Sequence, residues 1–378
     1  MNLYIGIDLG TSAVKLLLMD ELGEIKNMVT KTYPLEFPQP GWSQQDPQDW
    51  RKAVLEGIPE LLTGFDGSAV AGIGCGGQMH GLVILDAADH VIRPAILWND
   101  GRTADQVDYL NHVIGKKDNV IRPAILWNDG RTDKETKYLN EVIGKETLSR
   151  LTANIAFAGF TAPKILWLRE NEESNFKKIA KIMLPKDYVN YILTGVHACD
   201  YSDASGMLLL DVEHKCWSKE MLQIVGVSEA QMPKLFESYD CIGTVKPEVA
   251  KLLGLGENVK VAAGAGDNAA AAVGTGVVGE GGCNISLGTS GTVFISSEKF
   301  GVDSTNALHA FAHADGGYHL MSCMLSAASC NKWLLEDILK TSDYATEQAA
   351  IREDRLGENH TYFLPYLMGE RSPINDTN

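Results

Sequence analysis

Apolar and polar positions alternate at the start of the chain. Apolar side chains occupy every second position from Leu3 to Leu9, and a second apolar run extends from Val14 to Met19. A period of two is typical of strands with one buried face. The two strands are joined by a short connection, Asp8-Leu9-Gly10-Thr11-Ser12. The pattern therefore predicts a β-hairpin with a tight turn.

The composition of this turn suits an anion. A glycine beside two hydroxyl residues exposes backbone N–H groups that can hold phosphate oxygens, and the Asp8 carboxylate can hold a hydrated cation beside them. An ordinary turn with a polar lining is the alternative interpretation.

The same pattern recurs far along the chain. Ile285 precedes Ser286-Leu287-Gly288-Thr289-Ser290, and a β-rich run to Ile295 follows. The chain therefore contains two strand-turn-strand units with Leu-Gly-Thr-Ser at their turns. The simplest explanation is a protein of two lobes whose loops face one polyphosphate.

A third stretch combines small residues with one carboxylate. Val259 to Ala263 reads as the end of a buried strand, and the alanines after Asp267 predict a closely packed helix. Near a helix N-terminus, Asp267 is expected to stay ionised at neutral pH and to accept a proton from a bound hydroxyl. A role only as helix N-cap is the alternative.

Composition and charge narrow the classes of function. A chain of 378 residues predicts two domains, and 45% hydrophobic with 22% charged residues is typical of a globular protein. The net charge of -16 argues against nucleic acid and anionic membranes as partners. Seven scattered cysteines suit a reducing cytosol, no segment is long enough to span a membrane, and the N-terminus shows no signal peptide, so a cytoplasmic location is expected.

Several motifs together resemble the FGGY family of carbohydrate kinases. They are Gly6 to Ser12, Gly41-Trp42-Ser43-Gln44-Gln45-Asp46-Pro47, Gly76-Gly77-Gln78-Met79-His80-Gly81, Phe160 to Trp167, Asp200-Tyr201-Ser202-Asp203-Ala204-Ser205-Gly206, Gly266-Asp267-Asn268-Ala269-Ala270 and Phe363 to Pro373. The resemblance implies an α/β fold of duplicated actin-like ATPase (ribonuclease H-like) domains. The Gly76–Gly81 loop resembles that of the family's xylulose kinases. The segment from Asp200 to Gly206 lines a cleft or forms turns and caps.

The resemblance implies phosphoryl transfer from MgATP to the O5 hydroxyl of D-xylulose, with Asp267 as catalytic base. Met79 and His80 are then expected to contact the sugar, Asn268 to donate to a sugar hydroxyl, and Asp8 to orient Mg²⁺ or its waters. The expected phosphate-binding residues are Gly10, Thr11, Ser12, Lys15, Gly288, Thr289 and Ser290. Another ketose or polyol, such as ribulose or glycerol, is the alternative substrate.

An internal repeat departs from the family pattern. Residues 91–103 recur unchanged at 120–132, and the similarity extends over about 89–117 and 118–146. The resemblance implies that one tryptophan, Trp98 or Trp127, faces the sugar; ordinary core packing is the alternative role.

The expected domains are 1–279, with the sugar site and the base, and 280–378, the start of a second domain that is truncated relative to the family. A non-catalytic sugar-binding remnant is therefore a further alternative. The resemblance also makes a homodimer a candidate assembly.

Overall fold

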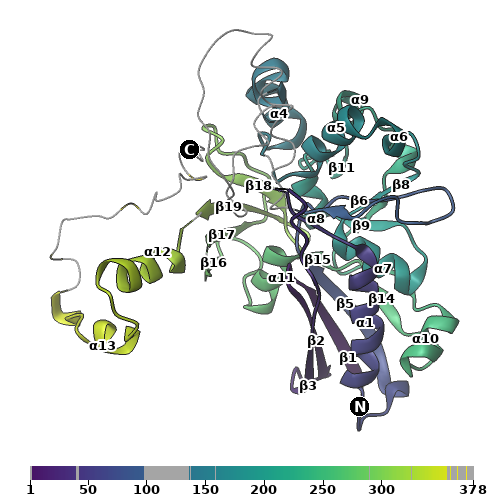
Figure 1. Cartoon of the computed structure of the whole chain (residues 1–378), viewed down its shortest axis with the longest axis horizontal. Helices are drawn as coiled ribbons and strands as arrows, with labels where there is room; N and C mark the ends of the chain where they lie inside the picture. The colour runs from purple at the N-terminus through teal and green to yellow at the C-terminus, as the bar shows by residue number, and fades with distance from the viewer. Residues whose placement is uncertain are drawn as a thin grey trace.

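The computed structural model describes residues 2–39, 42–97, 136, 138–157, 159–288, 290–324, 326–355, 358, 364 and 372. Within this part, a seven-stranded sheet and a four-stranded sheet organise the chain (Figure 1). Most of the internal repeat, including Trp98 and Trp127, lies outside the described residues, as does most of the motif at 363–373. No helix among the described residues is long and apolar enough to cross a membrane.

The larger sheet has the order β13-β14-β5-β1-β2-β3, with β15 also paired to β5. Its strands are β1 (Leu3–Leu9), β2 (Ala13–Asp20), β3 (Ile25–Thr32), β5 (Val70–Gly77), β13 (Cys241–Thr244), β14 (Lys260–Ala262) and β15 (Ala265–Gly266). The antiparallel pairing of β1 with β2 confirms the predicted N-terminal hairpin.

Parallel pairing brings three strand ends to one edge of this sheet. Gly77, the last residue of β5, lies beside Leu9 at the end of β1 and beside Gly266 at the end of β15. The residues that follow these three ends are Gly10, Gln78 and Asp267. Ligands of open α/β sheets commonly bind at the carboxyl ends of strands, so this edge is where a site is expected.

Helices cover both faces of the larger sheet. A Cβ at Gly76 would meet Ala270 of α11 (Asp267–Gly274), whereas one at Gly77 would meet Lys186 of α7 (Pro185–Thr194). Successive strand residues point to opposite faces, so α11 and α7 lie on opposite sides. Helix α1 (Pro47–Leu61) packs on β2 and β3 and begins after the N-cap residue Asp46.

The other strands before residue 283 form two-stranded pairs. The strands are β4 (Gln44–Gln45) with β7 (Ala95–Ile96), β6 (Val83–Leu85) with β8 (Lys181–Met183), β9 (Ala198–Asp200) with β12 (Lys234–Phe236), and β10 (Leu210–Asp211) with β11 (Cys216–Trp217). The helices are α4 (Lys145–Thr152), α5 (Thr161–Asn171), α6 (Glu173–Phe176), α8 (Tyr201–Ala204), α9 (Lys219–Val225) and α10 (Pro247–Leu253).

The second sheet is antiparallel, with the order β16-β17-β19-β18. It consists of β16 (Cys283–Leu287), β17 (Gly291–Ser297), β18 (His309–Ala312) and β19 (Tyr318–Met324), and the short helices α12 (Ala328–Lys332) and α13 (Tyr344–Ala349) follow. The pairing of β16 with β17 confirms the second predicted hairpin. Phe294 and Phe311 of this sheet are buried in the same hydrophobic cluster as Phe160 and Trp167, which lie at the start of α5 and within it.

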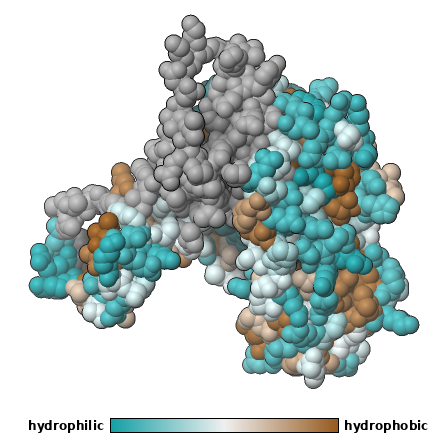
Figure 2. All heavy atoms as spheres, viewed as in Figure 1, coloured by the Kyte–Doolittle hydropathy of each residue, from teal (hydrophilic) through white to brown (hydrophobic). Residues whose placement is uncertain are grey.

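Polar residues cover most of the described surface on the face drawn in Figure 2. Figure 2 shows mostly hydrophilic residues on the coloured part of this face, with several groups of hydrophobic ones among them. Exposed large hydrophobic side chains include Leu22 (82%) and Leu252 (61%), as well as Ile285 (61%) and Leu287 (70%) of β16.

Candidate active site

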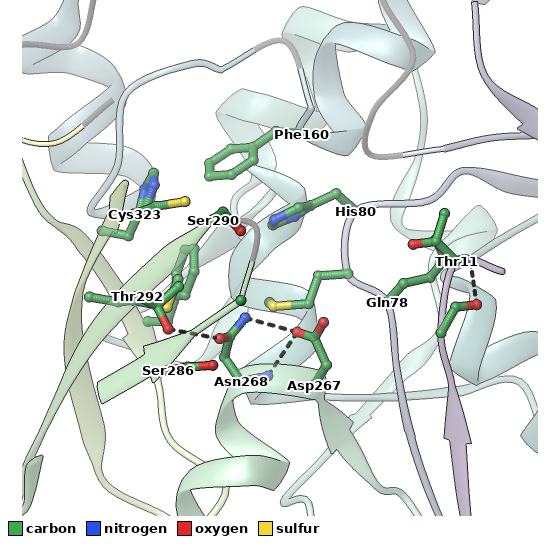
Figure 3. Close-up of a pocket in the computed structure, with 16 residues that line it drawn as sticks. Thr11, Gln78, His80, Phe160, Asp267, Asn268, Ser286, Ser290, Thr292 and Cys323 are labelled. Atoms are coloured by element: carbon green, nitrogen blue, oxygen red, sulfur yellow. Dashed lines mark hydrogen bonds between the residues drawn. The ribbon is translucent and has the colours of Figure 1, made fainter. Parts of the chain in front are cut away.

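A cavity of about 290 Å³ lies between the two sheets, and it collects predicted residues from widely separated parts of the chain (Figure 3). The predicted residues that line it are Gly10, Thr11, Met79, His80, Asp267, Asn268, Gly288 and Ser290. Side chains from both sheets therefore face one space.

A second cavity, of about 870 Å³, adjoins the first and is lined by Asp8 and Lys15. Asp267, Asn268 and Ser286 line both cavities. Asp267 therefore stands at the boundary between a space walled by His80 and a space that contains the Asp8 carboxylate. Ser12 belongs to the turn after β1 but is not among the residues lining either cavity.

Asp267 is the first residue of α11, and the N-cap position falls on Gly266. The helix N-terminus predicted from the sequence is confirmed, but the interpretation of Asp267 as its N-cap is wrong. One carboxylate oxygen, Oδ1, accepts hydrogen bonds from the backbone N (2.7 Å) and the side-chain Nδ2 (2.9 Å) of Asn268. Asn268 Oδ1 in turn accepts from Thr292 Oγ1 of the second sheet at 3.4 Å.

The environment of Asp267 raises its pKa to about 6, against the direction expected from a helix N-terminus alone. Desolvation by the surrounding protein is the main cause; the Asn268 hydrogen bonds oppose it and the negative charge of Asp8 adds to it. Asp267 is exposed to the cavity, and the protein around that cavity keeps part of the solvent away from its carboxylate. Met79 lines the same cavity. Asp267 is thus mainly ionised at pH 7 and is a stronger base than an ordinary aspartate.

The backbone holds His80 in an unusual conformation. Its φ is 66°, in the left-handed region that few non-glycine residues adopt. The His80 carbonyl accepts from the buried Lys164 Nζ at 2.6 Å and from Thr161 Oγ1 at 3.3 Å. The imidazole packs on Phe160 with ring centroids 4.7 Å apart. These contacts fix the direction in which the ring enters the cavity.

The tautomer of His80 follows from its partner. Nδ1 lies 2.7 Å from the Gly206 carbonyl oxygen, which can only accept. Nδ1 therefore carries the hydrogen, and Nε2 is the acceptor nitrogen of the neutral ring. A Cβ at Gly206 would clash with His80 Cε1, so the ring fits only because residue 206 is glycine.

The segment from Asp200 to Gly206 forms caps and turns beneath the site. Asp200 is the N-cap of α8 and is fully buried, with Lys186 Nζ at 3.0 Å. Ser202 Oγ donates to Asp200 and accepts from the backbone N of Gly266 at 3.2 Å. A buried ion pair therefore anchors the turn that presents Asp267.

Sequence reasoning left several lining residues without a role. They are Gln78, Phe160, Ser286, Thr292, His309, Phe311, Met321 and Cys323. Gln78, Phe160, Ser286 and Thr292 lie inside motifs that the sequence shows. His309 and Phe311 lie outside these motifs, and the sequence around them shows only large and small residues in turn, as in a strand. Thr289, Trp98 and Trp127 lie outside the described residues, so their predicted roles stay predictions.

The N-terminal domain of the FGGY family of carbohydrate kinases matches the chain over residues 3–116 and 111–274. These two matches overlap within the repeated segment, as a duplication inside one domain predicts. The xylulose kinase of Escherichia coli (strain K12) is 41% identical over 375 residues, which are 99% of this chain and 71% of that protein.

Solved structures agree with this match. The crystal structure of a xyloylose kinase from Brucella ovis superposes with a TM-score of 0.84 at 38% identity, covering 100% of this chain and 71% of the other. A gluconate kinase from Lactobacillus acidophilus gives a TM-score of 0.83 at 26% identity, covering 100% and 70%. On this evidence the chain belongs to the FGGY family of carbohydrate kinases.

Proposed function

We propose that this chain phosphorylates D-xylulose with ATP to form D-xylulose 5-phosphate. The observation that carries the proposal is the position of Asp267, at the boundary between the His80 cavity and the Asp8 cavity. A base at such a boundary can take a proton from a sugar hydroxyl on one side while that oxygen attacks a phosphoryl group on the other. The similarity to xylulose kinases supports the choice of sugar.

The sugar lies in the smaller cavity in this proposal. His80 Nε2 accepts a hydrogen bond from a sugar hydroxyl, since Nδ1 is committed to Gly206. Met79 forms the apolar wall. Asn268 uses one N–H to hold the Asp267 carboxylate, and its second N–H is directed to a sugar oxygen. In the same proposal the tryptophan that faces the sugar is Trp98 or Trp127.

The phosphates of ATP lie between the two turns. Backbone N–H groups and hydroxyls hold them, and these groups belong to Gly10-Thr11-Ser12 and Gly288-Thr289-Ser290. Lys15 adds positive charge. Asp8 fits a magnesium role, because its carboxylate lines the larger cavity near Asp267 and Mg²⁺ is usually held by one or two carboxylates plus substrate phosphates. When bound, Mg²⁺ neutralises charge that develops on the phosphoryl oxygens.

The proposal also includes the organisation of the chain. Residues 1–279 form the domain with the sugar site and the base, and residues 280–378 begin the domain that supplies the second phosphate turn. The seven cysteines are free thiols, which supports a reducing cytosol as the place of the reaction. A homodimer is part of the same proposal from the family resemblance.

Mass spectrometry of the reaction product tests the proposal. The purified chain is incubated with MgATP and D-xylulose, and Asp267→Asn is the matched variant, with nearly the same volume and no base. Formation of xylulose 5-phosphate only by the unmodified chain is expected. A product that forms equally well with Asp267→Asn would contradict the role of the base. Xylulose that stabilises the chain without any product would instead support a sugar-binding remnant.

Another sugar is the second candidate substrate, favoured by the gluconate kinase among the similar structures. A panel of xylulose, ribulose, gluconate and glycerol, compared by kcat/KM for ADP formation, separates the candidates. The highest value is expected for xylulose.

A further inference from the structure

Two buried side-chain amides lie beneath the loops of the proposed site. Gln45 is fully buried and Gln78 is 3% exposed. Gln45 belongs to β4, just before α1, whereas Gln78 follows β5 and directly precedes Met79 and His80. Residues that are distant in the sequence thus place two amides side by side.

Gln45 uses all four of its hydrogen-bonding positions. Its Nε2 donates to the carbonyl oxygens of Thr11 at 2.7 Å and Pro34 at 3.1 Å. Its Oε1 accepts from Trp50 Nε1 at 3.1 Å and from Gln78 Nε2 at 3.3 Å. Because carbonyl oxygens only accept and an indole N–H only donates, these partners allow one orientation of the Gln45 amide.

Gln78 connects this amide to the first phosphate turn. Its Nε2 also donates to the Gly10 carbonyl at 3.4 Å, and its Oε1 accepts from Thr11 Oγ1 at 3.3 Å. Its backbone N donates to the Leu9 carbonyl at 2.9 Å, which extends the pairing of β5 with β1. The Gln78 side chain therefore contacts the phosphate turn, while its backbone leads into the sugar loop.

We propose that Gln78 is a positioning residue that couples the sugar loop to the phosphate turn, so that xylulose and MgATP strengthen each other's binding. The inference rests on the proposed function. A shift of Gly10 or Thr11 toward a phosphate breaks or bends the hydrogen bonds of Gln78 unless Gln78 moves too. Because Met79 and His80 follow Gln78 directly in the chain, a movement of Gln78 also moves the sugar loop. Such a network, with every amide position of Gln45 used, favours discrete arrangements of both loops together.

Coupling of this kind is measured as a ratio of affinities. Titration calorimetry gives the Kd of a non-hydrolysable MgATP analogue with and without saturating D-xylulose, and by linkage the reverse titration must give the same ratio. The unmodified chain is expected to show tightening of about 5-fold or more. Gln78→Met keeps the length of the side chain but removes its hydrogen bonds, and should bring the ratio of the two Kd values close to one, whatever its effect on each separate affinity.

Two further variants keep the test decisive. Gln45→Met removes the second amide without touching the cavity lining and should also abolish the coupling, which covers the case in which Gln78→Met does not fold. Gln48→Met is the matched control, because Gln48 donates to Tyr188 outside this network at 3.0 Å and its loss should leave the ratio unchanged. A chain that binds no xylulose and forms no product refutes the proposed function. A chain that forms product but keeps its coupling in Gln78→Met and Gln45→Met refutes only this inference.

Discussion

The raised pKa of Asp267 predicts how the reaction depends on pH. With a pKa of about 6, the carboxylate is about 97% ionised at pH 7.5 and about 9% ionised at pH 5.0. Only the ionised form accepts a proton from the sugar. The value of kcat/KM for xylulose should therefore fall about tenfold between these pH values, with a midpoint near 6.

A variant of Asn268 separates this titration from that of the nucleotide. The Asn268 hydrogen bonds lower the pKa of Asp267, so Asn268→Leu, which removes the side-chain bond, should move the midpoint to higher pH. A titration of ATP would not move with this substitution. Overall activity is also expected to fall, but the midpoint is the quantity compared.

The assay follows ADP and sugar phosphate directly by chromatography, from pH 5.0 to 8.5 at saturating Mg²⁺, so that no coupling enzyme contributes its own pH dependence. Thermal unfolding at each pH shows that the chain stays folded. A flat profile down to pH 5.0, or a midpoint that is the same in Asn268→Leu, would show that the desolvated Asp267 carboxylate is not the titrating base.

Three further substitutions test the structure. Because the folded-state pKa of Asp267 exceeds its unfolded value, ionisation of its carboxylate destabilises the fold progressively from about pH 4 and in full above about pH 6. Asp267→Asn should therefore melt at a higher temperature at pH 7.5, with the difference vanishing below about pH 4. Gly206→Ala should displace His80 and raise the KM for xylulose at least about tenfold, with a smaller change in kcat. Gly264 has a φ of 77°, and a Cβ there would clash with the Cys75 carbonyl oxygen. Its substitution by alanine should cost at least about 2 kcal/mol in urea unfolding, whereas Gly274→Ala, with open space around it, should not.

The local patterns of the sequence were sufficient for the hairpins and for the helix that begins at Asp267. Alternating apolar residues define β1, an apolar run defines β2, and small residues define α11, because these features depend on side chains only a few positions apart. The motifs also identified half of the residues that line the smaller cavity. For Asp200 and Asp203, in contrast, local patterns allowed either a cleft floor or capping turns, and only the fold shows both buried beneath the site.

Long-range packing determines how these pieces meet. The parallel alignment of β1, β5 and β15 brings Gly10, Gln78 and Asp267 to one edge of the sheet, through pairings between residues that are far apart in the chain. The pKa of Asp267 is set by the same packing, since desolvation by surrounding walls outweighs the local helix N-terminus. The order of amino acids supplies the chemical groups, and the folded arrangement selects which of them share a cavity, because desolvation and hydrogen bonding act through space rather than along the chain.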